Sequence, residues 1–184
     1  MGGVPGFPSI AVVMGVAGAG KTTVGERLAE SLDWEFLEGD RLHPPENVAK
    51  MRSGQPLTDA DRAPWLDAIA RAIDTLQARN ARAIVTCSAL KRDYRRRIIG
   101  NRAAIRLVFL DGSRELIAER LAARRGHFMP AGLLDSQFEA LEPPGPDENP
   151  IIVGIDQPLD RIVAEIAAVL RPVPERPRGS AFTG

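Results

Sequence analysis

The feature that most constrains this sequence is the octapeptide GVAGAGKT at residues 15–22, which matches the pattern G-x-x-x-x-G-K-[ST] in full. A short apolar run rich in branched side chains precedes it at residues 10–14, and apolar residues at helical spacing follow it up to Leu32. The motif therefore lies between a predicted buried strand and a predicted helix that begins near Lys21. We expect strand, tight loop and helix in that order.

A glycine-rich loop in this position binds phosphate groups. Its glycines allow backbone conformations closed to other residues, so that successive amides and the helix N-terminus point at an anion. Lys21 supplies a cation for the β- and γ-phosphates, and Thr22 supplies a hydroxyl that commonly ligates Mg²⁺. The alternative is a glycine-rich turn beside a solvated lysine. The predicted contacts to ATP in this loop are Gly15, Val16, Ala17, Gly18, Ala19, Gly20, Lys21, Thr22 and Thr23.

Further apolar runs predict strands at residues 34–37, 83–87, 105–110 and 151–155. Helices are expected at residues 46–52 and from 59 to about 79, the second capped by Thr58 or Asp59. Strands separated by helices run parallel, so the sequence predicts a three-layer α/β/α sandwich with a five-stranded parallel sheet. Ligands of such a sheet bind at the carboxyl ends of its strands.

The chain of 184 residues, 44% hydrophobic, is suited to one domain, which we expect at residues 9–171. Residues 1–8 are expected to be a flexible N-terminus, and residues 172–184, rich in proline and arginine, a disordered tail. Residues 124–149 hold several glycines and prolines and are too long for an ordinary connection, which predicts a mobile lid at about 122–149.

Charge and composition exclude several classes of partner. Twenty-four basic residues balance 24 acidic ones, so we expect neither nucleic-acid nor membrane binding. The sequence has no apolar run of about 18 residues and no signal-peptide pattern, which favours a cytoplasmic protein. The single cysteine, Cys87, is expected in a buried strand and is a poor candidate nucleophile, because no histidine is placed beside it.

Two acidic residues, Glu38 and Asp40, follow the second predicted strand in the segment FLEGDRLHP. A carboxylate beside a phosphate loop can accept a proton from a hydroxyl or hold a Mg²⁺-bound water. We assign the role of base to Asp40 and a metal-side role to Glu38. The alternatives are that both acids cap the helix starting near Pro44, and that His43 is a turn residue rather than a substrate contact.

Seven blocks together resemble the gluconate kinase (gluconokinase) family in order and near spacing, over about residues 9–170. They are GVAGAGKTT, FLEGDRLHP, NVAKMRSGQPLTDADRAPWL, CSALKRDYR, ARRGHFMP, QFEALEPP and GIDQPL. The resemblance implies ATP-dependent phosphorylation of D-gluconate at its 6-hydroxyl, an adenylate- or shikimate-kinase-like P-loop fold with a lid, and a homodimer. Many members carry aspartate where this chain has Glu38, and serines where it has Ala17 and Ala19.

Cations are needed for both substrates. Arg120 and Arg124 lie four residues apart on one helix face, so both are predicted to contact the nucleotide, Arg124 also stabilising the transferring phosphoryl group. The alternative is a solvated arginine face. The further residues predicted on the gluconate side are His43, Arg52, Arg62, Ser88, Lys91, His127 and Gln137, together with Asp40. For Arg52, Arg62 and Lys91 a plain surface position is the alternative.

The sequence thus predicts in-line transfer from MgATP to gluconate, with Lys21, Asp40 and Arg124 as catalytic residues, and a product that enters central carbon metabolism. One rival is another small-molecule kinase of the same fold, acting on shikimate or a nucleoside. A second rival is a nucleotide-dependent switch that hydrolyses slowly and binds a partner. Trp65, Phe128, Phe138 and Leu141 are predicted to pack rather than bind ligand.

Overall fold

The computed structural model describes residues 8–102, 104–123 and 131–171, and its centre is a five-stranded sheet. The strands lie in the order β2-β3-β1-β4-β5, and every neighbouring pair is parallel. Their bounds are β1 (Ile10–Met14), β2 (Glu35–Glu38), β3 (Ala83–Thr86), β4 (Ile105–Asp111) and β5 (Ile151–Gly154). The predicted sheet is confirmed, with strand ends displaced by one residue at most.

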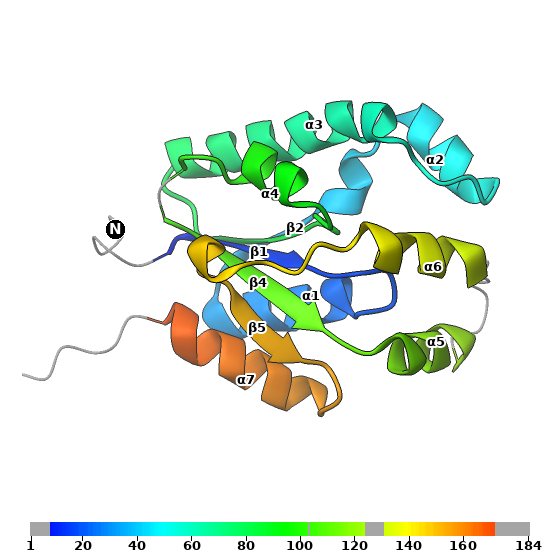
Figure 1. The fold of residues 1–184 in the computed structure, drawn as a ribbon. Coiled ribbons are helices and arrows are strands. Elements are labelled where there is room, and N and C mark those ends of the chain that lie inside the picture. Colours follow the sequence, from blue (N-terminus) through cyan, green and yellow to red (C-terminus); the bar gives the residue numbers. More distant parts are fainter. Residues whose placement is uncertain (1–7, 103, 124–130, 172–184) are drawn as a thin grey trace, which may run out of the picture.

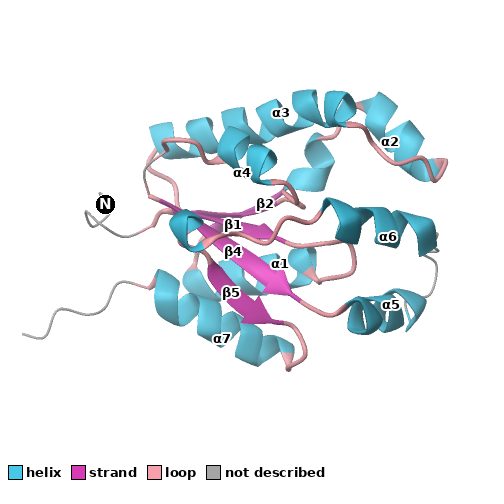
Figure 2. Cartoon of the chain, viewed as in Figure 1, coloured by secondary structure: helices cyan, strands magenta, loops and turns pink. Residues whose placement is uncertain are grey.

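Helices cover both faces of this sheet (Figures 1 and 2). The pair α3 and α4 covers one face, the pair α1 and α7 covers the other, and α5 and α6 lie beyond the carboxyl ends of the strands (Figure 1). The helices are α1 (Lys21–Leu32), α2 (Pro45–Arg52), α3 (Asp59–Ala78), α4 (Arg92–Ile98), α5 (Arg114–Ala123), α6 (Ala131–Ala140) and α7 (Leu159–Leu170), with 3₁₀ turns η1 (Gly39–Leu42) and η2 (Pro146–Glu148).

The core has two halves because side chains alternate across the central strand β1. Ala11 and Val13 pack in the cluster under α1 and α7, whereas Ile10, Val12 and Met14 pack in the cluster under α3 and α4. Both faces of β1 are fully buried, as the continuous apolar run predicts for the middle strand of a covered parallel sheet. The sheet therefore forms a rigid platform for the loops at its carboxyl edge.

Capping interactions fix where α3 begins. Thr58 Oγ1 accepts a hydrogen bond from the backbone N–H of Asp61 at 3.2 Å, and the Asp61 carboxylate accepts the N–H of Thr58 at 2.9 Å. This reciprocal arrangement satisfies two amide donors at the helix start. Of the two predicted caps, Thr58 is the one used.

The segment predicted as a lid contains regular structure where the chain is described. Helix α6 and turn η2 both lie within it, while residues 124–130 are outside the described residues. The expectations for most of the N-terminus (residues 1–7) and for the tail (residues 172–184) also fall outside them. Within the described ranges, no helix is both long enough and apolar enough to cross a membrane.

Candidate functional site

Three loops meet at the carboxyl edge of the sheet, after β1, β2 and β3. The N–H of Gly15, at the start of the phosphate loop, donates to the carbonyl of Ser88 in the loop after β3 at 3.4 Å. The N–H of Gly39, in the turn after β2, donates to Thr86 Oγ1 at 3.2 Å. Since β3 lies between β1 and β2, its last residue, Thr86, and Ser88 in the loop that follows connect the acidic turn to the phosphate loop. The predicted convergence of these segments is confirmed.

The phosphate loop has the geometry of an anion site. Gly18 and Gly20 have φ values of 86° and 93°, in the left-handed region that favours glycine. Helix α1 begins at Lys21 without a side-chain cap, so its first amides are left to a ligand. The Nζ of Lys21 donates to the carbonyl of Val16 at 3.1 Å, which folds this cation back over the loop.

Gln137 lies against the phosphate loop. Its Oε1 accepts a hydrogen bond from the N–H of Ala17 at 2.7 Å, although the two residues are 120 positions apart. The predicted role for Gln137 was contact with a sugar hydroxyl, and the structure instead gives its carbonyl a partner in the phosphate loop. Helix α6 is thus joined directly to the nucleotide side of the site.

A hollow of about 340 Å³ opens beside the phosphate loop. It is lined by Gly18, Ala19, Gly20, Thr23, Val24, Arg120, Ala123, Gln157, Leu159 and Ile162. Arg120 is held there because its guanidinium donates to the carbonyl of Ile155. Gln157 and Leu159 were not anticipated, although their position directly after β5, at the carboxyl edge, could have indicated them. Arg124 is outside the described residues.

The acidic pair occupies the turn after β2. Glu38 is the last residue of β2, its Oε1 contacts the hydroxyl of Thr86, and its Oε2 is buried without a hydrogen-bond partner among the described residues. Asp40 lies in η1 and is exposed. Helix α2 starts after Pro44 with no side-chain cap, so the alternative that the two acids cap it is wrong.

His43 follows this turn and stacks on Trp65, with ring centroids 4.0 Å apart and planes inclined by 13°. Trp65 is buried and donates from Nε1 to the carbonyl of Gly39 at 2.8 Å, so its predicted packing role is confirmed. Burial lowers the pKa of His43; Asp40 opposes this shift and Arg62 adds to it. Asp40 and Arg62 therefore lie close enough to His43 to act on the charge of its ring, and none of the three lines the hollow beside Arg120.

Lys91 is engaged by a neighbour. Its Nζ donates to both carboxylate oxygens of Asp59 at 2.8 Å, and it lies 5.5 Å from the centre of the Tyr94 ring. The hydrogen bonds from Lys91 and then from Tyr94 lower the pKa of Asp59, and Asp59 raises that of Lys91. Arg62 lies 5.9 Å from the same ring. Arg52 is exposed at the end of α2, and His127 is outside the described residues.

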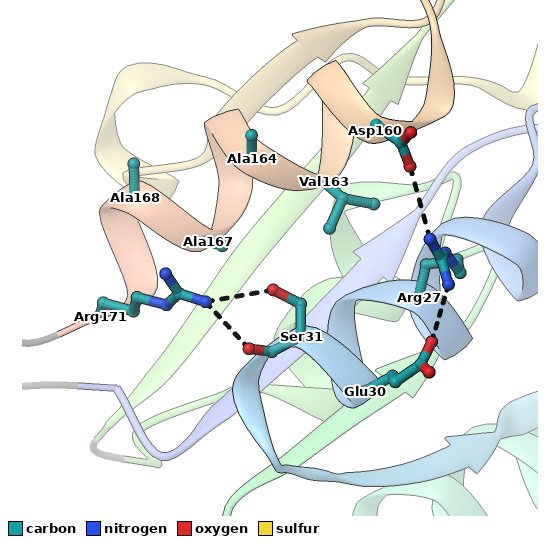
Figure 3. A pocket seen from close by; sticks show the side chains of 9 residues that line it. All are labelled: Arg27, Glu30, Ser31, Asp160, Val163, Ala164, Ala167, Ala168 and Arg171. Carbon is teal, nitrogen blue, oxygen red and sulfur yellow. Dashed lines mark hydrogen bonds and ion pairs between the residues drawn. The ribbon is translucent and has the colours of Figure 1, made fainter.

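Two other features contribute no chemistry to the site. Burial raises the pKa of the Cys87 thiol to about 12, which agrees with the expectation that it is not a nucleophile. A second hollow, of about 420 Å³, lies between α1 and α7 and contains none of the predicted site residues (Figure 3). There Arg27 pairs with Glu30 and Asp160, and Arg171 donates to Ser31.

Comparisons with known proteins agree with this geometry. Residues 10–144 match the family model described as an AAA domain. The gluconokinase of Gluconobacter oxydans (strain 621H) is 50% identical over 159 residues, which are 86% of this chain and 89% of that protein. A crystal structure of a gluconokinase from Sinorhizobium meliloti 1021 has a TM-score of 0.80 at 48% identity, covering 89% of this chain and 92% of that one. The crystal structure of a shikimate kinase from Bacteroides thetaiotaomicron has a TM-score of 0.60 at 18% identity, and the match covers 88% of this chain and 97% of that one. At this identity the similarity is one of fold alone.

Proposed function

The chain belongs to the gluconokinase family, and on that basis we propose that it transfers the γ-phosphoryl group of ATP to the 6-hydroxyl of D-gluconate. The product is 6-phospho-D-gluconate. The observation that carries the proposal is the meeting of a complete phosphate loop with the Glu38–Asp40 turn at one sheet edge, through contacts made by Thr86 and Ser88. Phosphoryl transfer needs this combination of an anion cradle and an adjacent carboxylate.

The reaction is a direct displacement. The 6-hydroxyl oxygen of gluconate bonds to the γ-phosphorus while the bond from that phosphorus to the β–γ bridging oxygen breaks, and ADP leaves. Asp40 accepts the proton of the hydroxyl, a role for which its exposed position in η1 leaves the carboxylate accessible. Lys21 and the loop amides hold the phosphates and stabilise the charge that develops on them. For Arg124 we keep the proposed role of neutralising the transferring group.

The residues present fit a Mg²⁺ ion that accompanies ATP. The buried Oε2 of Glu38 has no hydrogen-bond partner among the described residues. A buried polar atom is normally satisfied, so this oxygen is free to bind a hydrated cation. Among those residues there is no cluster of three or more His, Cys, Asp and Glu, and Mg²⁺ in kinases is held by one or two side chains plus phosphates. We propose Glu38 and the Thr22 hydroxyl as its protein partners. Bound there, Mg²⁺ would neutralise phosphate charge.

For the acceptor, Arg62 is our first choice of cation to bind the gluconate carboxylate. Among the described residues Arg62 makes no ion pair, whereas Lys91 is already paired with Asp59. Arg62 also acts electrostatically on His43, as Asp40 does. Ser88 and Arg52, for their positions along the chain, and His127, for the resemblance of its segment to related lids, remain proposed contacts, and Gln137 is better placed for the phosphate end.

On the nucleotide side, we assign the nucleoside to the hollow lined by Gly20, Thr23, Arg120 and Gln157. Its volume of about 340 Å³ suits a small-molecule ligand.

We also propose that the protein is a homodimer with a mobile lid at about residues 122–149, as the family resemblance implies, and that it is cytoplasmic, as its composition favours. Sedimentation velocity on the purified chain tests the dimer.

A coupled assay of ADP release from MgATP, with and without D-gluconate, tests the function. Gluconate-dependent release is the expected outcome. Shikimate and a nucleoside are tested in parallel as acceptors. Phosphorylation of either one, without phosphorylation of gluconate, would show that the chain is another kinase of this fold. Slow ADP release that responds to no acceptor would indicate a nucleotide-dependent switch instead.

A further inference from the structure

Asn47 is a buried polar residue that the proposed chemistry leaves without a role. It lies in α2, four residues after His43, and is only 4% exposed. Its Nδ2 donates to the main-chain carbonyl of Asp61 at 2.7 Å. The same Nδ2 lies 3.4 Å from Nδ1 of His43. One side-chain amide therefore connects α2, the start of α3 and the histidine ring.

The contact with Asp61 fixes the chemistry of the contact with His43. A carbonyl oxygen can only accept, so the atom of Asn47 that faces it is the amide nitrogen, which carries two protons. The second proton is directed at Nδ1 of His43, which must then present a lone pair. A neutral imidazole with an unprotonated Nδ1 carries its proton on Nε2. The orientation of Asn47 thereby favours the Nε2–H tautomer of His43.

The ring has little freedom to turn away from this arrangement. It stacks on the buried Trp65, with 4.0 Å between ring centroids, and Trp65 is itself anchored by its hydrogen bond to Gly39. The charged groups that face the ring are Asp40 from η1 and Arg62 from α3. These are the residues to which the proposed function gives the roles of base and carboxylate partner.

We propose that Asn47 is a positioning residue that holds His43 as the Nε2–H tautomer, so that the ring offers a fixed hydrogen-bond donor to a hydroxyl group of the acceptor. A polyhydroxy acid presents hydroxyl oxygens that accept such a bond. The assignment of the ligand rests on the proposed function, whereas the assignment of the tautomer does not. The proposal adds to the proposed acceptor site the residue, Asn47, that decides which ring nitrogen of His43 donates a hydrogen bond.

The pKa of His43 has a defined consequence in this arrangement. Burial lowers it, so the neutral ring dominates at neutral pH. The protonated ring also carries a proton on Nε2, so the donor persists on both sides of the transition. Through this residue, the KM for gluconate of the unaltered protein is therefore expected to be insensitive to pH.

Asn47→Asp reverses the polarity at Nδ1. A carboxylate accepts a proton from Nδ1, which raises the pKa of the ring and makes Nδ1–H the favoured neutral tautomer. Above the raised pKa, Nε2 then becomes an acceptor and the donor is lost. We expect the KM for gluconate of this variant to rise about 3- to 10-fold as pH increases, the loss of one hydrogen bond, with the KM for ATP little changed. A purely structural role would not create a new pH dependence.

Asn47→Ala is the second variant, in case the new carboxylate beside the Asp61 carbonyl impairs folding. It removes the constraint on Nδ1, so both tautomers of the neutral ring should be populated, and the KM for gluconate should rise above the pKa of the ring, whereas the protonated ring keeps its Nε2–H. Asn101→Asp makes the same change of charge at an exposed position after α4 and is the matched control, expected to keep a flat profile.

The tautomer itself is read by long-range ¹H–¹⁵N correlation spectra of the histidine rings. The chain has two histidines, and a His127→Gln variant assigns the signals of His43. The expected pattern is one protonated nitrogen at Nε2 at neutral pH, shifted toward Nδ1–H by Asn47→Asp. An Nδ1–H ring in the unaltered protein, or a flat KM profile in a folded Asn47→Asp variant whose tautomer has changed, would overturn the proposal. If gluconate proves not to be an acceptor, the spectra still test the tautomer, so the two failures are distinguishable.

Discussion

Arg95 and Glu148 form an ion pair that is almost removed from solvent, with side chains 2% and 14% exposed. Nε and Nη2 of Arg95 donate to the two carboxylate oxygens at 2.6 and 2.9 Å. Nη1 donates to the carbonyls of Ala89 and Leu90 at 3.2 and 3.0 Å. Ala89 has a φ of 44°, so the loop at residues 88–91 is held in an unusual conformation by this guanidinium. The pair thus connects a loop of the site to the segment that returns from α6.

Glu148→Ala should lower the free energy of unfolding by about 3 kcal/mol, because it leaves a buried guanidinium without its counter-charge. Urea denaturation followed by circular dichroism measures this change. The KM for gluconate should also rise, since Ser88 and Lys91 lie in the loop that Arg95 holds.

Asp147→Ala is the matched control for that variant. Asp147 pairs with Arg92 in the same segment, but the two side chains are 59% and 40% exposed. An exposed pair contributes at most about 1 kcal/mol, so this variant should remain close to the unaltered protein. Equal losses in the two variants would contradict the special role of the buried pair.

Stability at acid pH should depend on Glu148. The hydrogen bonds from Arg95, aided by the N–H of Gly145, hold the pKa of Glu148 below its ordinary value of 4.5, although burial opposes this. A carboxyl whose pKa is lower in the folded state contributes stability that is complete above its unfolded pKa and is lost as pH falls through the folded pKa. Urea midpoints should therefore decline below about pH 4.5, and less steeply in Glu148→Gln. Parallel slopes would assign the acid sensitivity to other carboxyls.

Gly39→Ala tests how closely the acidic turn must approach β3. A Cβ at Gly39 would lie 2.0 Å from the carbonyl oxygen of Thr86 and 3.4 Å from Ile69. The collision is with backbone, so the turn carrying Asp40 has to move. We expect a loss of about 1–3 kcal/mol in the free energy of unfolding, from overpacking. The kcat should also fall, since displacement of a catalytic group by about 1 Å can cost 100-fold. A folded variant with normal kcat would show that the turn tolerates displacement.

The sequence predicts the sheet well because its three inner strands, β1, β3 and β4, contain continuous buried apolar runs that can be recognised from the sequence alone. It also predicts the phosphate loop, since the motif is contiguous. Contacts between distant residues carry no such signal. Nothing in the segment around Gln137 indicates Ala17, and the pairing of Arg95 with Glu148 depends on how the segment after α6 packs on α4. Helix α6 was predicted only as part of a lid, because glycines and prolines at both sides obscure its ten residues.

Gln137→Glu should weaken ATP binding. The variant keeps an oxygen that can accept from the N–H of Ala17 but adds a negative charge at the loop that receives the phosphates. Repulsion between this carboxylate and the ATP phosphates is expected to raise the KM for ATP on the order of 10-fold, with a smaller change in the KM for gluconate. Steady-state kinetics with each substrate varied in turn measures the difference. Gln77→Glu in α3 is the control, and an equal effect there would remove Gln137 from the nucleotide side.

Asp40→Asn tests the proposed base most directly. The amide keeps the size of the side chain but cannot take the hydroxyl proton, so kcat should fall by a factor of about 100 or more. Because Asp40 is exposed and its side chain makes no hydrogen bond to another described residue, the free energy of unfolding should change by no more than about 0.5 kcal/mol. Glu46→Gln, at an exposed acid in the first turn of α2, should leave kcat near normal. If Asp40→Asn also retained a near-normal kcat, the proton would have to leave through Glu38 or solvent, and the buried Oε2 of Glu38 would become the group to alter next.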